Sequence, residues 1–270
     1  MTGFHSETAL IAIDEGRYSG HVSEHWNIGG NPNGGYLVSI VLGAISKLSK
    51  EHPDPLSVTT HYLRPGIPGE PCEVNVEVIR RGRSMTTARG QLIQVGKTRL
   101  EVLCAFGNLE NASANKPLVT LQAPQIPPPQ ECPERSGEAQ GVDLPIMNRI
   151  EIRVNPETIP DVEGTPPGRA EVSGWIRFRD QSAADSVSAV MFTDAFPPAL
   201  FGLLGVIGWV PTIELTVHVR QRPATPWLLG RFVTDDLQGE RMIETGALWD
   251  EQGALVAQSR QLGLLLPQGD

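Results

Sequence analysis

The chain has 270 residues and contains 28 glycines and 23 prolines, a composition that argues against a helical bundle or a coiled coil. A hydrophobic fraction of 40% with 20% charged residues is typical of a folded protein with a core and excludes global disorder. The net charge of -9 repels polyphosphate backbones, so we expect no nucleic-acid partner.

The sequence also bears on compartment and redox state. It has no apolar run of about 18 residues, and its first ten residues have neither a basic region nor an apolar stretch before a cleavage site, so we expect a cytoplasmic protein without a membrane partner. Cys72, Cys104 and Cys132 are odd in number and widely spaced. They fit neither a disulfide framework nor a metal site, and we expect them to be reduced.

The first half of the chain predicts one helix followed by strands. The helix starts after Asn33-Gly34-Gly35 and continues to Leu48, because apolar residues recur there at the spacing of a wide buried stripe. Alternation of valines with polar residues over 74–78 predicts a half-buried antiparallel strand. Further strands are predicted at 57–64, 85–94 and 97–106.

A proline-rich segment separates the two halves. Residues 111–145 hold seven prolines and little periodic apolar content, so neither a helix nor a sheet can run through them. We therefore predict an N-terminal domain at 1–110, a linker at 111–145 and a C-terminal domain at 146–270.

The second half repeats the same order. Apolar residues from Val187 to Leu204 predict a second helix, which Pro197-Pro198 must break or kink just after Asp194. Strands are predicted, in chain order, at 170–179, 212–219, 227–234, 241–249 and 254–264.

The two halves also share landmark residues at one offset, which indicates a duplication. His61, Gly82 and Gly96 of the first half have the same residue types 157 positions later, at His218, Gly239 and Gly253. A helix followed by long antiparallel strands is best covered when the sheet wraps around the helix. The predicted fold is α+β, a double hotdog of two tandem domains; two unrelated α+β domains are the alternative.

Several motifs then resemble those of one family, the acyl-CoA thioesterase II (TesB-like) proteins. They cover most of 20–110 and 146–265, in the family's order and near its spacing. The motifs are Gly34-Gly35, His61-Tyr-Leu-Arg-Pro-Gly66, Val76-Glu77-Val-Ile-Arg80-Arg-Gly82-Arg-Ser84, Thr212-Ile-Glu214, Arg222-Pro223, Trp227-Leu228, and Asp250-Glu-Gln-Gly253-Ala-Leu-Val256-Ala257 followed by Gln261.

The resemblance implies hydrolysis of an acyl-CoA thioester by water, without an acyl-enzyme intermediate. The family's Asp, Thr and Gln fall on Asp194, Thr212 and Gln261, the last placed by its distance from the preceding Gly-Ala-Leu-Val motif. If the register is shifted, Thr216 and Gln258 replace the second and third of these residues.

Physical chemistry supports the same trio. A carboxylate can act as general base towards water, and the apolar neighbours of Asp194 in the sequence favour a raised pKa. Thr212 and Gln261 would then orient the water towards the carbonyl. The backbone amides of Gly34 and Gly35, at a helix start, are the predicted oxyanion site.

The remaining candidates are basic residues and histidines. Arg80, Arg81 and Arg83 belong to the only basic concentration and are candidates for the CoA phosphates, with a solvated sheet face as the alternative. By the period-two rule, His218 could face the same side of its strand as Thr212. The Gly90 to Thr98 stretch has the wrong glycine spacing for a phosphate loop, and we expect a hairpin turn at Gly96-Lys97.

The sequence therefore predicts a cytoplasmic homo-oligomeric thioester hydrolase of fatty acid metabolism, with no metal and no cofactor beyond the CoA of its substrate. One alternative is an acyl-CoA or acyl-carrier binding protein without catalysis. The other is a hotdog dehydratase, which needs an Asp/His pair and could take its histidine only from His61 or His218.

Overall fold

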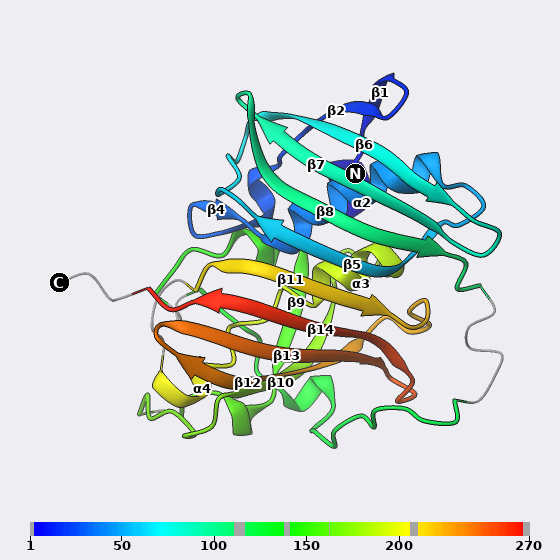
Figure 1. Cartoon of the computed structure of the whole chain (residues 1–270). Coiled ribbons are helices and arrows are strands. Elements are labelled where there is room, and N and C mark those ends of the chain that lie inside the picture. Colours follow the sequence, from blue (N-terminus) through cyan, green and yellow to red (C-terminus); the bar gives the residue numbers. More distant parts are fainter. Residues whose placement is uncertain (1–2, 111–116, 138–140, 162, 206–209, 267–270) are drawn as a thin grey trace.

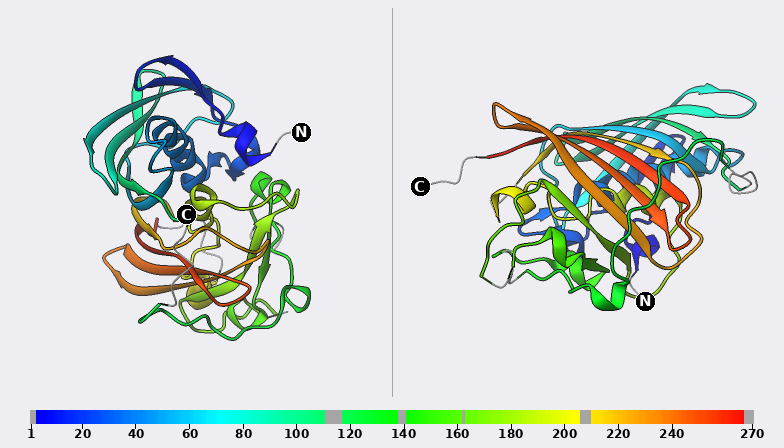
Figure 2. Two further views of the ribbon diagram at one scale, coloured as in Figure 1. Left: turned by 90° about the vertical axis from the view of Figure 1, so that its right-hand side faces the viewer. Right: turned by 90° about the horizontal axis from the view of Figure 1, so that it is seen from below.

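The structure of the protein is a computed structural model that describes residues 3–110, 117–137, 141–161, 163–205 and 210–266. Within these ranges, one antiparallel sheet of twelve strands runs through both halves of the chain, with α2 and α3 on the same side of it (Figure 1). Seen along its edge, each half of the sheet curves around its helical layer (Figure 2).

The sheet has the strand order β1-β2-β6-β7-β8-β5-β11-β14-β13-β12-β10-β9. The strands of the first half are β1 (Ile11–Asp14), β2 (Arg17–His21), β5 (Asp54–Tyr62), β6 (Pro71–Arg81), β7 (Thr86–Gln94) and β8 (Lys97–Gly107). Those of the second half are β9 (Ile150–Val154), β10 (Glu171–Phe178), β11 (Thr212–Val219), β12 (Leu228–Gln238), β13 (Arg241–Asp250) and β14 (Leu255–Leu264).

Short elements complete the chain. A separate ribbon pairs β3 (Asn27–Ile28) with β4 (Asn31–Pro32). The α-helices are α1 (Phe4–Glu7), α2 (Gly34–Leu48), α3 (Ser186–Phe192) and α4 (Phe201–Leu204), and the 3-10 turns are η1 (Glu24–Trp26), η3 (Pro129–Glu131), η5 (Pro145–Asn148) and η6 (Pro156–Thr158).

The predicted helix of the first half is confirmed as α2. The Asn33 side chain caps it by accepting a hydrogen bond of 2.9 Å from the Tyr36 amide, which satisfies one of the free N–H groups of the first turn. Most α2 side chains are buried, because the sheet covers one side of the helix and α3 packs against another. The double-hotdog prediction is correct.

The predicted second helix is interrupted, but the break comes before Asp194 rather than just after it. Helix α3 ends at Phe192, and α4 starts only at Phe201, since Pro197 and Pro198 have no amide to continue the hydrogen-bond ladder. The segment between the two helices carries Asp194, so the interruption frees this carboxylate from a helical position.

The two halves meet at the pair β5–β11, and its register reveals their relation. Thr59 pairs with Thr216, with 3.0 Å between the two hydroxyl oxygens, and these residues are 157 positions apart. His61 pairs with Glu214, and His218 pairs with Ser57. Antiparallel pairing of a residue with its own equivalent places a local two-fold axis at Thr59 and Thr216, which supports the duplication inferred from the sequence.

The segment between the halves lies against the second half. Of residues 111–145, those at 117–137 and 141–145 are described; they contain only short turns and one isolated bridge, Glu134 to Arg153. Two tryptophans of the sheet donate to carbonyls of this segment, Trp249 to Leu121 at 3.0 Å and Trp175 to Pro127 at 2.9 Å. The segment thus shields a small apolar cluster on the outer side of the sheet.

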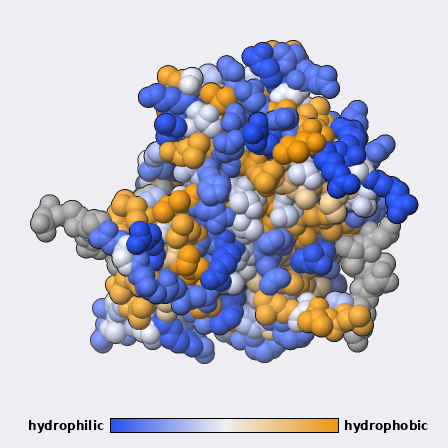
Figure 3. All heavy atoms as spheres, viewed as in Figure 1, coloured by the Kyte–Doolittle hydropathy of each residue, from blue (hydrophilic) through white to orange (hydrophobic). Residues whose placement is uncertain are grey.

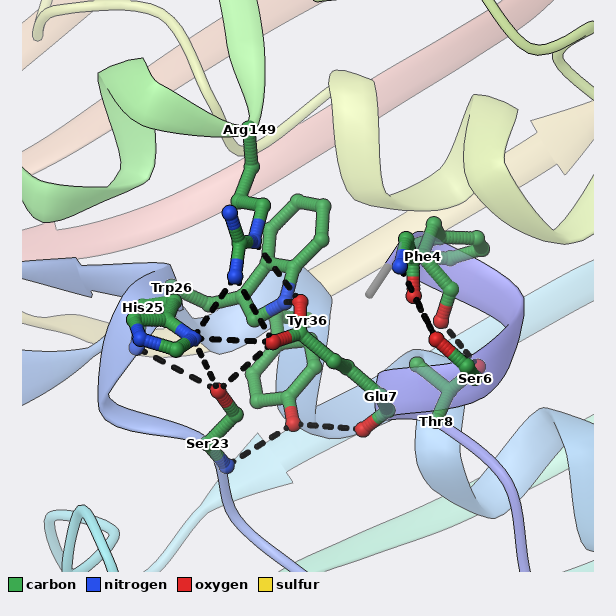
Figure 4. Close-up of polar contacts among 10 residues, drawn as sticks. Phe4, Ser6, Glu7, Thr8, Ser23, His25, Trp26, Tyr36 and Arg149 are labelled. Carbon is green, nitrogen blue, oxygen red and sulfur yellow. Dashed lines mark hydrogen bonds and ion pairs between the residues drawn. The ribbon is translucent and has the colours of Figure 1, made fainter. Parts of the chain in front are cut away.

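The N-terminal segment is tied to the second half by a partly buried ion pair between Glu7 and Arg149 (Figure 4). The Glu7 carboxylate accepts from Arg149 Nε and Nη2 at 2.8 and 3.0 Å and from Trp26 at 2.9 Å, and His25 Nδ1 lies 2.9 Å from Glu7 Oε1. Burial by itself would raise the pKa of Glu7, but the hydrogen bonds from Arg149, His25 and Trp26 outweigh it and lower the pKa to about 2.

Some strands were not predicted. Strand β1 carries Ile11 and Ile13 at alternate positions, but it has only four residues and is exposed along its whole length. Strand β9 does alternate, with isoleucine and valine at every second position, but it is short and lies close to the proline-rich segment. The outer face of the sheet mixes hydrophilic and hydrophobic residues (Figure 3), and Leu103 is among the exposed apolar ones.

Candidate active site

A cavity of about 580 Å³ opens where the start of α2 meets the segment after α3. Tyr62 and Arg64 line it from the first half, and Asp194, Thr212 and Gln261 line it from the second half. Phe196, Phe201, Phe232, Met242 and Leu264 are among the apolar residues of its wall. The fold therefore brings the three predicted residues, from three separate segments, to one cavity.

The Asp194 carboxylate is held at the N-terminus of α2. Its Oδ2 accepts from the Gly35 amide at 2.8 Å and from Asn33 Nδ2 at 3.0 Å, and Asn33 Nδ2 also lies 2.8 Å from the Asp194 carbonyl oxygen. The positive end of the α2 dipole and its free amides suit a carboxylate at this position. The side chain is fixed from the opposite half of the molecule.

These surroundings leave Asp194 a stronger base than an ordinary aspartate. Burial raises the pKa of Asp194 to about 6, against the lowering effect of the hydrogen bonds from Gly35, Asn33 and Gly34. At neutral pH the group is mostly ionised and still close enough in pKa to accept a proton. A carboxylate has about four lone-pair sites, so capacity for a water molecule remains.

The two glycines act differently from the prediction. The Gly35 amide, predicted to serve an oxyanion, instead donates a hydrogen bond to Asp194 in this structure. A Cβ atom at Gly35 would lie 2.8 Å from Met191 Cα, and one at Gly34 would lie 2.9 Å from the Tyr62 hydroxyl. The glycines allow α2 to approach α3 and Tyr62 closely, which lets Asp194 reach the start of α2.

Thr212 faces the cavity because of a β-bulge. Thr212 pairs with Gly263 and Glu214 pairs with Leu262, so Ile213 is an extra residue in β11. The bulge reverses the alternation, and Thr212 shares the inner side with Leu215 rather than the outer side with Thr216. The expectation that His218 shares a face with Thr212 is wrong for this reason, and His218 is exposed.

Gln261 completes the group from the neighbouring strand. It pairs with Leu215 on β11, an inward position, and its Nε2 donates to Thr212 Oγ1. This bond leaves the threonine hydroxyl hydrogen free to point towards the cavity. Thr216 and Gln258, the alternatives in case of a shifted register, do not line the cavity.

The first-half positions that the local two-fold axis relates to Thr212 and Gln261 carry no equivalent polar side chains. Subtracting 157 from Thr212 and Gln261 gives Pro55 and Cys104. Cys104 is buried and donates to the Ala88 carbonyl, and proline has no side-chain hydrogen-bonding group. The duplication therefore retains the polar arrangement on one side only.

The predicted CoA arginines lie elsewhere. Arg81 donates to the Leu48 carbonyl at the C-terminus of α2, and the Arg83 carbonyl lies 3.2 Å from His52 Nε2. Helix α2 has 15 residues, so its two ends are about 20 Å apart. The structure does not bring Arg80, Arg81 or Arg83 to the cavity.

Two further residues lining the cavity were missed. Arg64 is an exposed cation at its opening, within the His61 to Gly66 motif. Glu244 is a buried acid on β13. The sequence could have pointed to Glu244, because it is the only charged residue among the inward positions Met242, Glu244, Gly246 and Leu248 of an alternating strand.

The described residues were also searched for other kinds of site. They contain no group of three or more His, Cys, Asp or Glu side chains placed to hold a metal ion. In the same part of the chain, no helix has both the length and the apolar character needed to cross a membrane. All three cysteines are buried and unpaired.

Known structures share this fold along the whole chain. A protein from Thermobifida fusca named as a candidate thioesterase II is 28% identical, with a TM-score of 0.85 and coverage of 98% of both chains. A hotdog-fold protein of unknown function from Alicyclobacillus acidocaldarius is 22% identical, with a TM-score of 0.83 and the same coverage. The acyl-CoA thioesterase II TesB2 of Mycobacterium marinum is 21% identical, with a TM-score of 0.73 and coverage of 99% of both chains.

Comparison of the sequence with known proteins leads to the same family as the comparison of structures. An uncharacterized protein of Mycobacterium tuberculosis is 26% identical over 93% of this chain and 91% of its own length. The family model of the acyl-CoA thioesterase N-terminal domain matches residues 22–107, and that of the C-terminal domain matches residues 128–265. With its two halves matched and the double hotdog in place, this chain belongs to the acyl-CoA thioesterase family.

Proposed function

We propose that the protein hydrolyses acyl-CoA thioesters to a carboxylic acid and CoA. The observation that carries the proposal is the meeting of Asp194, Thr212 and Gln261 at one largely apolar cavity. None of the six histidines of the chain lines this cavity, which disfavours a dehydratase that needs an Asp/His pair.

In the proposed reaction, water is the nucleophile. Asp194 accepts a proton from a water that the Thr212 hydroxyl and Gln261 orient, and the hydroxide adds to the thioester carbonyl carbon. The C–S bond of the tetrahedral intermediate then breaks, and the thiolate of CoA leaves with the proton that Asp194 took. Only one water is consumed, and no bond to the protein forms.

The cavity also suggests how the substrate lies. The apolar wall around Phe196 and Phe232 suits the acyl group, while the long CoA moiety must remain at the opening. Arg64 is exposed there. The arginine of the Arg-Pro pair in the second half, Arg222, is neutralised by Asp54 at 2.8 Å, whereas no carboxylate pairs with Arg64 among the described residues. We propose Arg64 as the cation that meets the CoA phosphates.

The test is release of free thiol from a panel of short- to long-chain acyl-CoAs. Asp194→Asn keeps the shape and removes the base, and we expect turnover to fall by at least about a hundredfold while the fold persists. Thr212→Val should also lower turnover, and Thr216→Val, on the outer side of the same strand, is its matched control.

Two outcomes would contradict the proposal. If the parent protein binds acyl-CoA but releases no thiol, it is a binding protein. If Asp194→Asn retains parental turnover, another group is the base.

A further inference from the structure

A second carboxyl group lies in the cavity beside the proposed catalytic residues. Glu244 is on β13 directly opposite Gln261 on β14, with both side chains on the inner side of the sheet. Side chains that face each other across two antiparallel strands are about 5 Å apart at Cβ. Glu244 is therefore close to the place where a thioester carbonyl would be attacked.

The Glu244 carboxyl group is buried, and only one of its two oxygens has a hydrogen bond from the protein. Glu244 is 6% exposed, and its Oε2 accepts a hydrogen bond of 2.8 Å from the Ala199 amide. No other hydrogen bond and no ion pair of Glu244 is found among the described residues. The Oε1 atom thus lacks a protein partner in a residue that forms part of the cavity wall.

The neighbouring wall makes this arrangement unfavourable for a purely aliphatic substrate. Phe196, Phe232 and Met242 surround the same cavity and offer no hydrogen-bonding group. A hydrocarbon chain that displaces water from Oε1 would leave a buried polar atom without a hydrogen-bond partner. The free energy lost in this way is larger than the free energy that a typical hydrogen bond contributes. A substrate with its own polar group at this depth would avoid that loss.

A hydroxyl group suits the open Oε1 atom of Glu244 in either protonation state, because an ionised carboxylate accepts a hydrogen bond from it and a protonated carboxyl can also donate one. Burial, together with the charge of Asp194, raises the pKa of Glu244 to about 7, against the hydrogen bond from Ala199. A carboxyl that is partly protonated near neutrality can both donate and accept, as a hydroxyl can. An ammonium group would instead require a fully ionised partner and would lose its own hydration in the apolar cavity.

We propose that Glu244 recognises a hydroxyl group on the acyl chain, within a few carbons of the thioester carbonyl, so that the preferred substrates are hydroxyacyl thioesters. This inference rests on the proposed hydrolase function. Glu244 is then a specificity-determining residue, separate from the Asp194, Thr212 and Gln261 group that handles water.

The experiment compares kcat/KM for butanoyl-CoA with that for its 2-, 3- and 4-hydroxy derivatives. We expect the parent to prefer one hydroxy isomer by about tenfold or more, since a site built to bond a hydroxyl rejects the analogue without it. Glu244→Gln, which keeps a donor, an acceptor and the bond to Ala199, should retain most of this preference. Glu244→Met should abolish or reverse it.

The ratio between substrates separates recognition from a structural role. If Glu244 only holds the Ala199 amide, Glu244→Met lowers kcat/KM for all four substrates equally, and the inference fails. Ile243→Val, on the outer side of the same strand and away from the cavity, is the control and should leave the ratio unchanged. A ratio near one in the parent would also overturn the inference.

Failure of the hydrolase proposal gives a different result. In that case no substrate releases thiol, and calorimetric dissociation constants for the same four compounds test Glu244 without turnover. A parent that binds a hydroxy isomer about tenfold more tightly, with the preference lost in Glu244→Met, supports recognition. Equal dissociation constants refute it.

Discussion

Replacement of Gly35 by alanine tests the idea that the close approach of α2 and α3 positions the Asp194 carboxylate, the proposed general base. The new Cβ would lie 2.8 Å from Met191 Cα and 3.1 Å from Asp194 Cβ, whereas ordinary contact starts at 3.4 Å. The two segments must therefore separate by about 0.6 Å, the difference between 3.4 and 2.8 Å. The 2.8 Å bond from Gly35 to Asp194 would lengthen to about 3.4 Å, beyond the usual range.

The expected effect is larger on activity than on folding. A displacement of about 1 Å at a reacting group can cost a factor of about 100, so we expect kcat/KM for acyl-CoA to fall by about ten- to a hundredfold. Overpacking costs about 1–3 kcal/mol, which would lower the melting temperature by several degrees without unfolding the protein. Thiol release and thermal unfolding, measured on the same samples, distinguish the two effects.

The matched control is Gly43→Ala in the middle of the same helix. A Cβ there meets only the Thr8 carbonyl oxygen, at 4.0 Å, so the change should leave activity intact and stabilise the helix by about 0.5–1 kcal/mol. Parental kcat/KM in Gly35→Ala would refute the reasoning, because the carboxylate would then tolerate the separation of α2 from α3.

Three further predictions concern charges. Because Asp194 must be ionised to accept a proton and its pKa is raised to about 6, kcat/KM should fall about tenfold per pH unit below that value, and a flat profile from pH 5 to 8 would contradict this role. The ionised Glu7 carboxylate stabilises the fold above its ordinary pKa of 4.5, and this stabilisation is lost as pH falls through about 2. Because His25 and Trp26 share in lowering the pKa, Arg149→Met should cost about 1–2 kcal/mol in urea unfolding at pH 7 and much less near pH 2. Arg64→Gln should raise KM for acyl-CoA but not for the N-acetylcysteamine thioester, which lacks phosphates, whereas Arg81→Gln should change neither; the reverse pattern would favour the first-half arginine cluster.

The sequence by itself determined the elements and their duplication. Period-two alternation located β6 and β11, and apolar spacing after Asn33 located α2, because these patterns depend only on which side of an element is buried. The offset of 157 was readable from His61 and His218, since hairpins and strands of equal length keep landmark residues in register. Family motifs then pointed to Asp194, Thr212 and Gln261.

Only the tertiary structure decided how those residues face one another. Period two places Thr212 outside, and the bulge at Ile213 that turns it inward depends on pairing with β14, a strand far along the chain. The Gly35 amide looked available for an oxyanion until the fold brought Asp194 against it across 159 positions. Long-range contacts of this kind leave no local pattern, because the partner of a buried polar group is chosen by topology rather than by its neighbours in sequence.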